Sequence, residues 1–104
     1  MKTLIKDILK FRDDRNWKQF HTPENLSKSI VLEAAELLEN FQWGDKYADI
    51  DNIKEELADI FIYGLLLAEH YGFDFKEIIE EKLKKNNKKY PIEHSKGNAK
   101  KYNK

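Results

Sequence analysis

Residues 57–68 read LADIFIYGLLLA, and Asp59 is the single charge among these twelve positions. A helix that is apolar almost all the way round is typical of a buried helix. An unpaired carboxylate in such a place costs free energy or takes up a proton, so Asp59 needs a partner. The stretch therefore predicts a buried helix over about residues 52–71 that carries a carboxylate into an apolar setting.

Helix signals also dominate on both sides of this stretch, and no strand-like alternation persists. A helix is expected over about residues 3–15, with Leu4, Ile5, Ile8 and Phe11 on one side. After a break, Thr22 and Pro23 resemble an N-cap and the first position of a helix over about residues 23–42.

The loop after this second helix is expected at residues 44–51, with Asp51 as the cap of the buried helix. Gly72 is a typical residue just past a helix end, and Asp74 starts a fourth helix over about residues 75–89. These signals predict an all-α protein with one domain over residues 1–91. A lysine-rich tail over residues 92–104 follows.

Composition excludes several classes of protein. The 104 residues contain no cysteine, which excludes disulfides and thiolate metal sites. The N-terminus MKTLIKDILKFRDD has acids among its apolar residues, unlike a signal peptide. The longest weakly charged run is too short to span a bilayer. We therefore expect a soluble, cytoplasmic protein without a membrane partner.

The charges are distributed unevenly although they sum to zero. Residues 82–104 hold nine lysines against Glu93 alone, which leaves the rest of the chain acidic. The lysines are interpreted either as a solvated tail or as cations that face a polyanion. Nucleic acid is an unlikely partner, because the remaining chain is acidic and contains no nucleic-acid-binding motif.

Two carboxylate pairs with a spacing of three carry the main chemical signal. Glu33 and Glu36 fall at the edge of the apolar arc of the second helix, and Glu56 and Asp59 share a face of the third. Four carboxylates in one cluster repel one another and raise one another's pKa. Mg²⁺, with Mn²⁺ as a substitute, would resolve this repulsion with oxygen ligands. The alternative is that each acid pairs with a lysine or an arginine.

Two other kinds of metal site fit less well. A di-iron bundle needs Glu-x-x-His on two helices, and no histidine here follows a glutamate at that spacing. Zinc prefers histidine or cysteine ligands, and the three histidines are scattered.

Basic and aromatic residues complete the candidate site. Lys82, Asn86, Lys89 and Tyr90 fall on or beside the inward stripe of the fourth helix, where they either reach phosphate oxygens or snorkel along the core edge. Aromatic residues are interpreted either as core anchors or as a wall on which a base stacks. Those singled out are Trp17, Trp43 and Tyr63, the last on the face of Glu56 and Asp59.

The pattern Glu33-x-x-Glu36 followed by Glu56-x-x-Asp59 resembles the EXXE…EXXD signature of the MazG-like, all-α nucleoside triphosphate pyrophosphohydrolases. The segments RNWKQFHTPENL (15–26), EAAELLENFQW (33–43), EELADIFIY (55–63) and KLKKNNKKYP (82–91) are similar to the branch that contains dCTP pyrophosphatase. This resemblance covers about residues 12–100.

The resemblance implies a four-helix-bundle-type fold completed by oligomerisation into a homodimer or homotetramer. It also implies Mg²⁺-dependent hydrolysis of a (d)NTP, such as dCTP or a modified pyrimidine nucleotide, to the monophosphate and pyrophosphate. The resemblance implies that Glu33, Glu36, Glu56 and Asp59 bind the metal, with Glu36 and Glu33 as catalytic carboxylates. It implies that phosphate or sugar is bound by Lys82, Asn86, Lys89 and Tyr90. It also implies that Trp17 and Trp43 contact the base and that His21 and Asn25 shape the pocket entrance.

Two other functions stay open at the level of sequence. One is a nucleotide-sensing or adaptor module that keeps the fold without fast chemistry. The other is a purely structural helical oligomer, in which replacing Asp59 by leucine would stabilise the protein.

Overall fold

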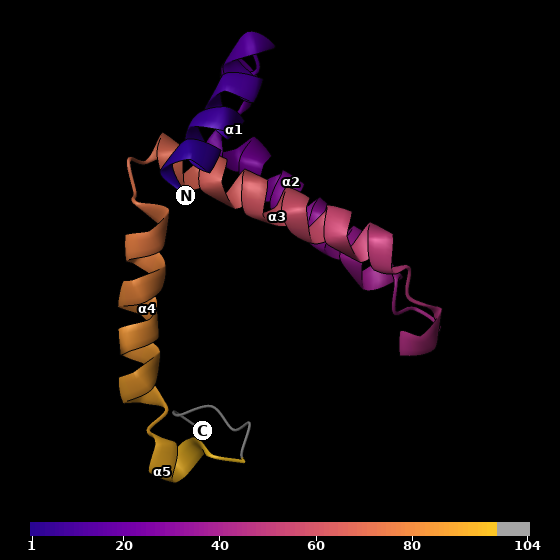
Figure 1. Ribbon diagram of the computed structural model, residues 1–104, viewed down its shortest axis with the longest axis vertical. Helices are drawn as coiled ribbons and strands as arrows, with labels where there is room; N and C mark the ends of the chain where they lie inside the picture. Colours follow the sequence, from indigo (N-terminus) through magenta and orange to yellow (C-terminus); the bar gives the residue numbers. More distant parts are fainter. Residues whose placement is uncertain (98–104) are drawn as a thin grey trace. The chain divides into compact units, whose positions relative to one another are not determined.

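The computed structural model describes residues 1–97, and all regular structure in that range is helical (Figure 1). The chain divides into one compact unit over Met1–Gly72 and a second that begins at Phe73. The all-α prediction is confirmed. The helices are α1 (Lys2–Asp14), α2 (Pro23–Glu39), α3 (Ile50–His70), α4 (Phe75–Lys89) and α5 (Ile92–Ser95), with 3-10 turns η1 (Lys18–Phe20) and η2 (Asp45–Tyr47).

Polar side chains cap three of the helices. Thr22 Oγ1 accepts a hydrogen bond from the Asn25 amide at 3.1 Å, and Pro23 follows at the first helical position, as predicted. Asp74 caps α4 in the same way through the Glu77 amide at 3.0 Å, also as predicted. Each cap satisfies an amide that lacks a partner inside its helix.

The predicted cap of α3 is wrong by two residues. Asp49, not Asp51, accepts the hydrogen bond from the Asn52 amide, at 3.2 Å. Asp49 has the extended backbone that turns its carboxylate back over the helix start. Asp51 lies inside the first turn, where its negative charge interacts favourably with the positive end of the helix dipole.

The end of α2 also differs from the prediction. The helix ends at Glu39, and the amides of Asn40, Phe41 and Gln42 then bond to carbonyls three residues back. This tightened last turn explains why the helical pattern in the sequence continues to residue 42. The Asn40 side chain joins the loop to α3, because it donates to Asn52 Oδ1 at 2.8 Å and accepts from the Asp49 amide.

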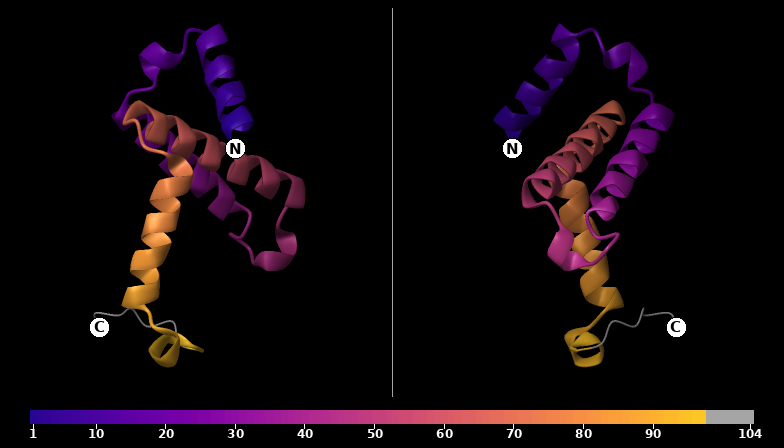
Figure 2. Two further views of the ribbon diagram at one scale, coloured as in Figure 1. Left: turned by 60° about the vertical axis from the view of Figure 1, so that its left-hand side comes forward. Right: turned by 90° about the vertical axis from the view of Figure 1, so that its right-hand side faces the viewer.

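Helices α2 and α3 form an antiparallel hairpin, and α1 contacts α3 (Figure 2). The apolar core consists of Leu26 from α2 with Leu65, Leu66 and Ala68 from α3. The predicted apolar arc of α2 is divided by this arrangement. Leu26 is buried, and Ile30 and Leu37 are half-buried. Ala34 and Leu38 of the same arc are exposed.

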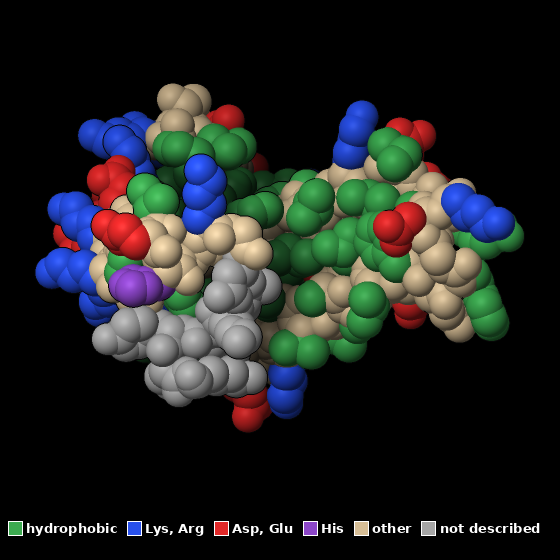
Figure 3. Space-filling view, turned by 90° about the horizontal axis from the view of Figure 1, so that it is seen from below, with side chains coloured by type: hydrophobic (Ala, Val, Ile, Leu, Met, Phe, Trp, Pro, Cys, Tyr) green, Lys and Arg blue, Asp and Glu red, His purple; other side chains and the backbone are tan. Residues whose placement is uncertain are grey.

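The expectation that α3 is buried all round is not met within this unit. Two partner helices cover only part of it, so Leu57 and Phe61 are exposed, the latter by 55%. Exposed apolar side chains also lie along α2, and Figure 3 shows hydrophobic side chains over the surface of the hairpin. We call Val31, Leu32, Leu38, Leu57 and Phe61 the outer apolar face.

The second unit contains α4 and the short helix α5. The predicted bounds of α4 are confirmed, whereas α5 within the predicted tail was not expected. Residues 98–104 of that tail lie outside the described residues, and the predicted domain boundary at residue 91 stays a prediction. Among residues 1–97, no helix combines the length and apolar character needed to cross a membrane.

Candidate functional site

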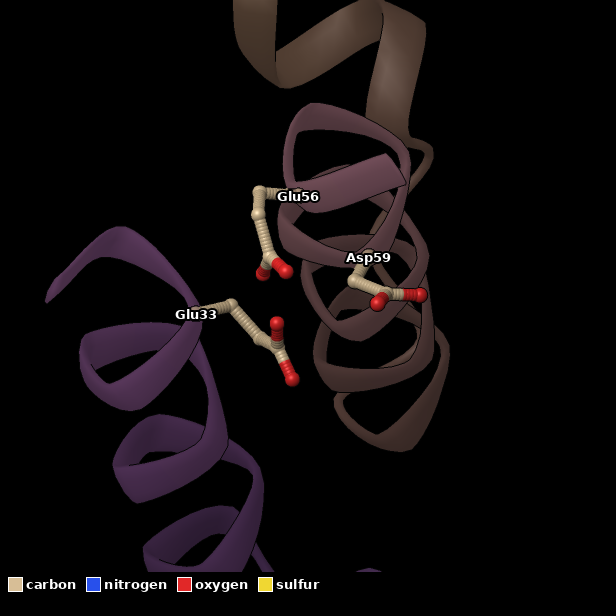
Figure 4. Close-up of side chains that lie close together, drawn as sticks. All are labelled: Glu33, Glu56 and Asp59. Atoms are coloured by element: carbon tan, nitrogen blue, oxygen red, sulfur yellow. The ribbon is translucent and has the colours of Figure 1, made fainter. Parts of the chain in front are cut away.

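Three carboxylates from two helices meet on the inner face of the α2–α3 hairpin. Glu33 of α2 and Glu56 and Asp59 of α3 each offer an oxygen, and these oxygens lie within 4.8 Å of one another. Figure 4 shows Glu33 reaching from its helix toward Glu56 and Asp59 on the other. The spacing of three residues places Glu56 and Asp59 on one helical face, and antiparallel pairing brings Glu33 opposite them.

Glu36, the fourth predicted acid, lies beside the same group. It is exposed, and its contact with Glu56 raises the pKa of Glu36. Contact with Glu33, followed by burial, raises the pKa of Glu56, which is only 8% exposed. Both shifts arise because neighbouring carboxylates disfavour one another's ionised form. We call Glu33, Glu36, Glu56 and Asp59 the acidic cluster.

The acidic cluster has no cationic partner among residues 1–97. None of the ion pairs formed by those residues includes a member of the cluster. Glu33 Oε2 and Glu56 Oε2 are buried and lack a hydrogen-bond partner in this range. Buried oxygens without donors are rare in stable proteins. A set of carboxylate oxygens of this kind fits a hard divalent cation such as Mg²⁺.

A cavity of about 430 Å³ lies next to the acidic cluster. Asp59 is part of its wall, and three of the predicted substrate residues, Trp17, His21 and Tyr63, line it as well. Most of the remaining wall is apolar. These further lining residues are Asp7, Ile8, Phe11, Arg12, Ile62 and Leu66 from α1 and α3.

The segment between α1 and α2 positions the aromatic part of this wall. The Trp17 ring meets the Phe11 ring edge-on, with centroids 5.7 Å apart, and the His21 ring at 6.5 Å. Asn25 Nδ2 donates to the Phe20 carbonyl at 3.0 Å and so holds this segment against the start of α2. Asn25 therefore supports the cavity wall from behind rather than lining it.

Tyr63 faces the cavity from α3. Burial, followed by the charges of Glu33 and Asp59, raises the pKa of Tyr63. Its hydroxyl therefore stays protonated beside the acidic cluster, as a hydrogen-bond donor.

Arg12 is a buried cation in the cavity wall that was not predicted from the sequence. The Arg12 side chain donates from Nε to Asp13 Oδ1 at 2.8 Å and from Nη1 to Glu69 Oε2 at 3.2 Å. Asp13 is the main cause of the raised pKa of Arg12. The only signal in the sequence is a basic residue one turn after Ile8 on the inward face of α1. Glu69 lies 57 positions away, and nothing in the sequence connects the two.

The remaining predicted residues lie after α2 and in the second unit. Trp43 follows the end of α2 and is 76% exposed. In the second unit, Lys82 and Asn86 line a shallow hollow on α4, and Lys89 Nζ lies 5.8 Å from the centre of the Tyr90 ring. The roles predicted for these residues stay predictions.

The chain is similar to proteins named as pyrophosphatases in sequence and in structure. The mouse (Mus musculus) and human (Homo sapiens) proteins named dCTP pyrophosphatase 1 are 35% and 33% identical to this chain over 101 residues. Both alignments cover 88% of this chain, which spans only 59% of each relative's length. The crystal structure of a pyrophosphatase from Archaeoglobus fulgidus superposes with a TM-score of 0.78 at 38% identity, over 88% of this chain and 92% of that one.

The family match extends over most of the chain and includes the whole acidic cluster. Residues 28–104 match the MazG-like family, and this range contains α3 and residues 28–39 of α2, which together carry all four acids. The match over this range, together with the archaeal structure, shows that the chain belongs to the MazG-like family.

Proposed function

We propose that this protein is a Mg²⁺-dependent nucleoside triphosphate pyrophosphohydrolase that releases a nucleoside monophosphate and pyrophosphate. The observation that carries the proposal is the acidic cluster, which lacks a cationic partner within residues 1–97 and adjoins a largely apolar cavity. Family membership supports the same reaction. The similarity to dCTP pyrophosphatases favours dCTP or a modified pyrimidine deoxynucleotide as the substrate.

Glu33, Glu36, Glu56 and Asp59 would hold Mg²⁺, with Mn²⁺ as a substitute, in this proposal. The bound ion would supply positive charge that stabilises the phosphate oxygens as negative charge develops on them. The carboxylates supply the oxygen ligands that such an ion prefers. No lysine, arginine or histidine among residues 1–97 forms an ion pair with these oxygens, so none competes with the metal for them.

Hydrolysis needs a group that accepts a proton from water. In the proposed reaction a water oxygen bonds to the α-phosphorus, and the bond from that phosphorus to the bridging oxygen breaks. Glu36 is exposed at the edge of the acidic cluster, and the raised pKa of Glu36 makes it a better proton acceptor. Glu33 lies within the same cluster and is proposed as a second catalytic carboxylate, since in such a cluster the proton belongs to the group rather than to one residue.

The cavity would bind the base. Trp17 and Tyr63 offer aromatic surface, and His21 and the Tyr63 hydroxyl offer hydrogen-bonding groups. Asp59 belongs to both the cavity wall and the acidic cluster, so a base in the cavity would direct its phosphates toward the cluster. Lys82, Asn86, Lys89 and Tyr90 are proposed to bind phosphate or sugar, and Trp43 to contact the base.

We also propose that a second copy covers the outer apolar face and completes a four-helix arrangement. Five large apolar side chains of α2 and α3 are exposed there, and apolar surface of this kind is typical of a region that a partner covers. Assembly as a homodimer or homotetramer would bury them. Residues 1–91 would form the assembling catalytic domain, with residues 92–104 as its tail. Sedimentation of the purified protein tests this proposal, and a monomer at micromolar concentration would contradict it.

The direct test of function is pyrophosphate release from a panel of deoxy- and ribonucleoside triphosphates, with Mg²⁺ and with EDTA. We expect release that depends on the metal, with the monophosphate as the other product. Asp14→Asn is a matched control, because Asp14 is an exposed acid paired with Lys10 on α1. If the folded protein releases no pyrophosphate from any nucleotide of the panel, the proposal is contradicted. Mg²⁺-dependent nucleotide binding without product would favour a nucleotide-sensing module.

A further inference from the structure

His21 lies at the junction of two cavities in the first unit. One is the cavity of about 430 Å³ beside the acidic cluster. The other, of about 240 Å³, has walls from Arg12, Lys18, His21, Leu66, Glu69 and His70. Arg12 and His21 line both cavities, so the buried guanidinium and the imidazole share one environment.

The two ring nitrogens of His21 differ in their access to a ligand. Nδ1 is buried and has no hydrogen-bond partner among residues 1–97. Since the ring lines both cavities, Nε2 is the nitrogen that can meet a ligand there. A neutral imidazole carries one proton, so the tautomer decides whether Nε2 donates or accepts a hydrogen bond.

Burial of Nδ1 selects the tautomer, because a proton on this nitrogen would be a buried donor without an acceptor among residues 1–97. Arg12 acts on the charge of the ring. The guanidinium is permanently charged, is only 5% exposed, and is held by Asp13 and Glu69, so it disfavours a second proton on an imidazole that lines the same two cavities. Burial, followed by the charge of Arg12, lowers the pKa of His21 and favours the neutral ring.

We propose that Arg12 is a positioning residue that keeps His21 neutral, with the single proton on Nε2, so that His21 donates a hydrogen bond to the base of a bound nucleotide. The ligand in this statement rests on the proposed function. A base edge with an acceptor, such as a carbonyl oxygen, fits this donor, and an amino group at the same edge does not. The charged and titratable groups around the ring are Asp7 and Arg12 of α1, Lys18 of η1, and Asp59, Tyr63, Glu69 and His70 of α3.

The test is nitrogen-15 NMR of the histidine rings in the full chain, without nucleotide or metal. In the wild type we expect His21 with Nε2 protonated and Nδ1 unprotonated at neutral pH. Arg12→Gln can still donate to Glu69 but has no charge, so the protonation midpoint of His21 should rise. Arg12→Lys restores the charge and should restore the midpoint. Lys10→Gln, which removes an exposed cation of the same helix, should change neither.

A kinetic measurement connects the ring to the substrate. Arg12→Gln should raise KM for the best nucleotide about 3- to 10-fold, the loss expected for one misplaced hydrogen bond, with kcat changed less than about 2-fold. Wild-type His21 with Nδ1 protonated, or the same midpoint in wild type and Arg12→Gln, would overturn the proposal. An inactive wild type with the expected NMR result would contradict the proposed function but not the effect of Arg12 on His21.

Discussion

Helix α3 carries two groups of buried charge that differ in one respect. Near its start, Glu56 is 8% exposed and lies beside the carboxylates of Glu33, Glu36 and Asp59. Near its end, Glu69 accepts a hydrogen bond from Arg12, which is 5% exposed and also pairs with Asp13. The chain therefore neutralises one group from within, whereas among residues 1–97 it supplies no opposite charge for the other.

The difference separates a charge that the chain neutralises itself from one that needs a cation from outside. A buried charge with hydrogen-bonded partners of opposite sign can persist without any ligand, and Arg12 uses its partners to join α1 to α3. Carboxylates without such partners repel one another, and the folded chain tolerates them because a cation from outside can relieve the repulsion. Four experiments with substitutions or added metal test this contrast.

The largest expected effect is on turnover. Asp59→Asn removes charge from the acidic cluster with little change in shape, so kcat/KM for the best nucleotide should fall roughly 10²- to 10³-fold. Glu36→Gln should also abolish most turnover. Steady-state pyrophosphate release measures both effects, and circular dichroism should show an unchanged helix content. Near-normal activity in both folded variants would remove the acidic cluster from the mechanism.

The next effect is on stability in the presence of metal. Mg²⁺ at about 100 times its dissociation constant should add about 2.7 kcal/mol to the free energy of unfolding. A thermal melt of wild type with and without the ion measures this gain, and Asp59→Asn should lose most of it. Glu56→Gln should raise Tm without metal, because it removes a like charge. A wild type that does not respond to Mg²⁺ or Mn²⁺ would contradict a cation site.

A smaller effect is expected at the neutralised group. Arg12→Met should lower the free energy of unfolding by roughly 1–2 kcal/mol, because α1 loses its polar connection to α3. Chemical denaturation measures the loss, which should be the same with and without Mg²⁺. A loss that depends strongly on the metal would show that the two charged groups are coupled, which would contradict the view that they act separately.

The smallest effect concerns an exposed ion pair. Lys28 and Glu24 lie 3.3 Å apart on α2, with both side chains more than half exposed. Lys28→Met should therefore change the free energy of unfolding by at most about 0.5 kcal/mol. The same denaturation experiment provides this baseline, and a loss as large as that of Arg12→Met would show that burial is not what distinguishes the Arg12 group.

Much of the helical structure was predictable because its signals are local. The Thr22–Pro23 start of α2 and the Asp74 start of α4 follow from capping chemistry within a few residues. The errors fall where several signals compete. Two aspartates stand near the start of α3, and only the backbone around Asp49 decides which of them caps the helix.

The acidic cluster was predictable in part for the same reason. A spacing of three places each pair of acids on one helical face, so Glu56 and Asp59 were expected together. Two such pairs on adjacent helices also predicted one shared cluster, but the register of α2 against α3 that brings Glu33 opposite Glu56 and Asp59 is set by packing between the helices. The exposed apolar positions, such as Leu38 and Phe61, were expected in a core because periodicity marks a face as apolar without showing what covers it.

The sequence by itself determines that the chain is helical, where most helices begin and end, and which acids share a helix face. Capping, periodicity and spacing act over one or two turns, so these features follow from the order of the residues. The tertiary structure alone decided that Trp17, His21 and Tyr63 share a cavity with Asp59, and that Arg12 finds Glu69 on a distant part of the chain. Such contacts depend on how α1 docks against α3, and docking is set by the shapes of whole helix faces rather than by any local signal.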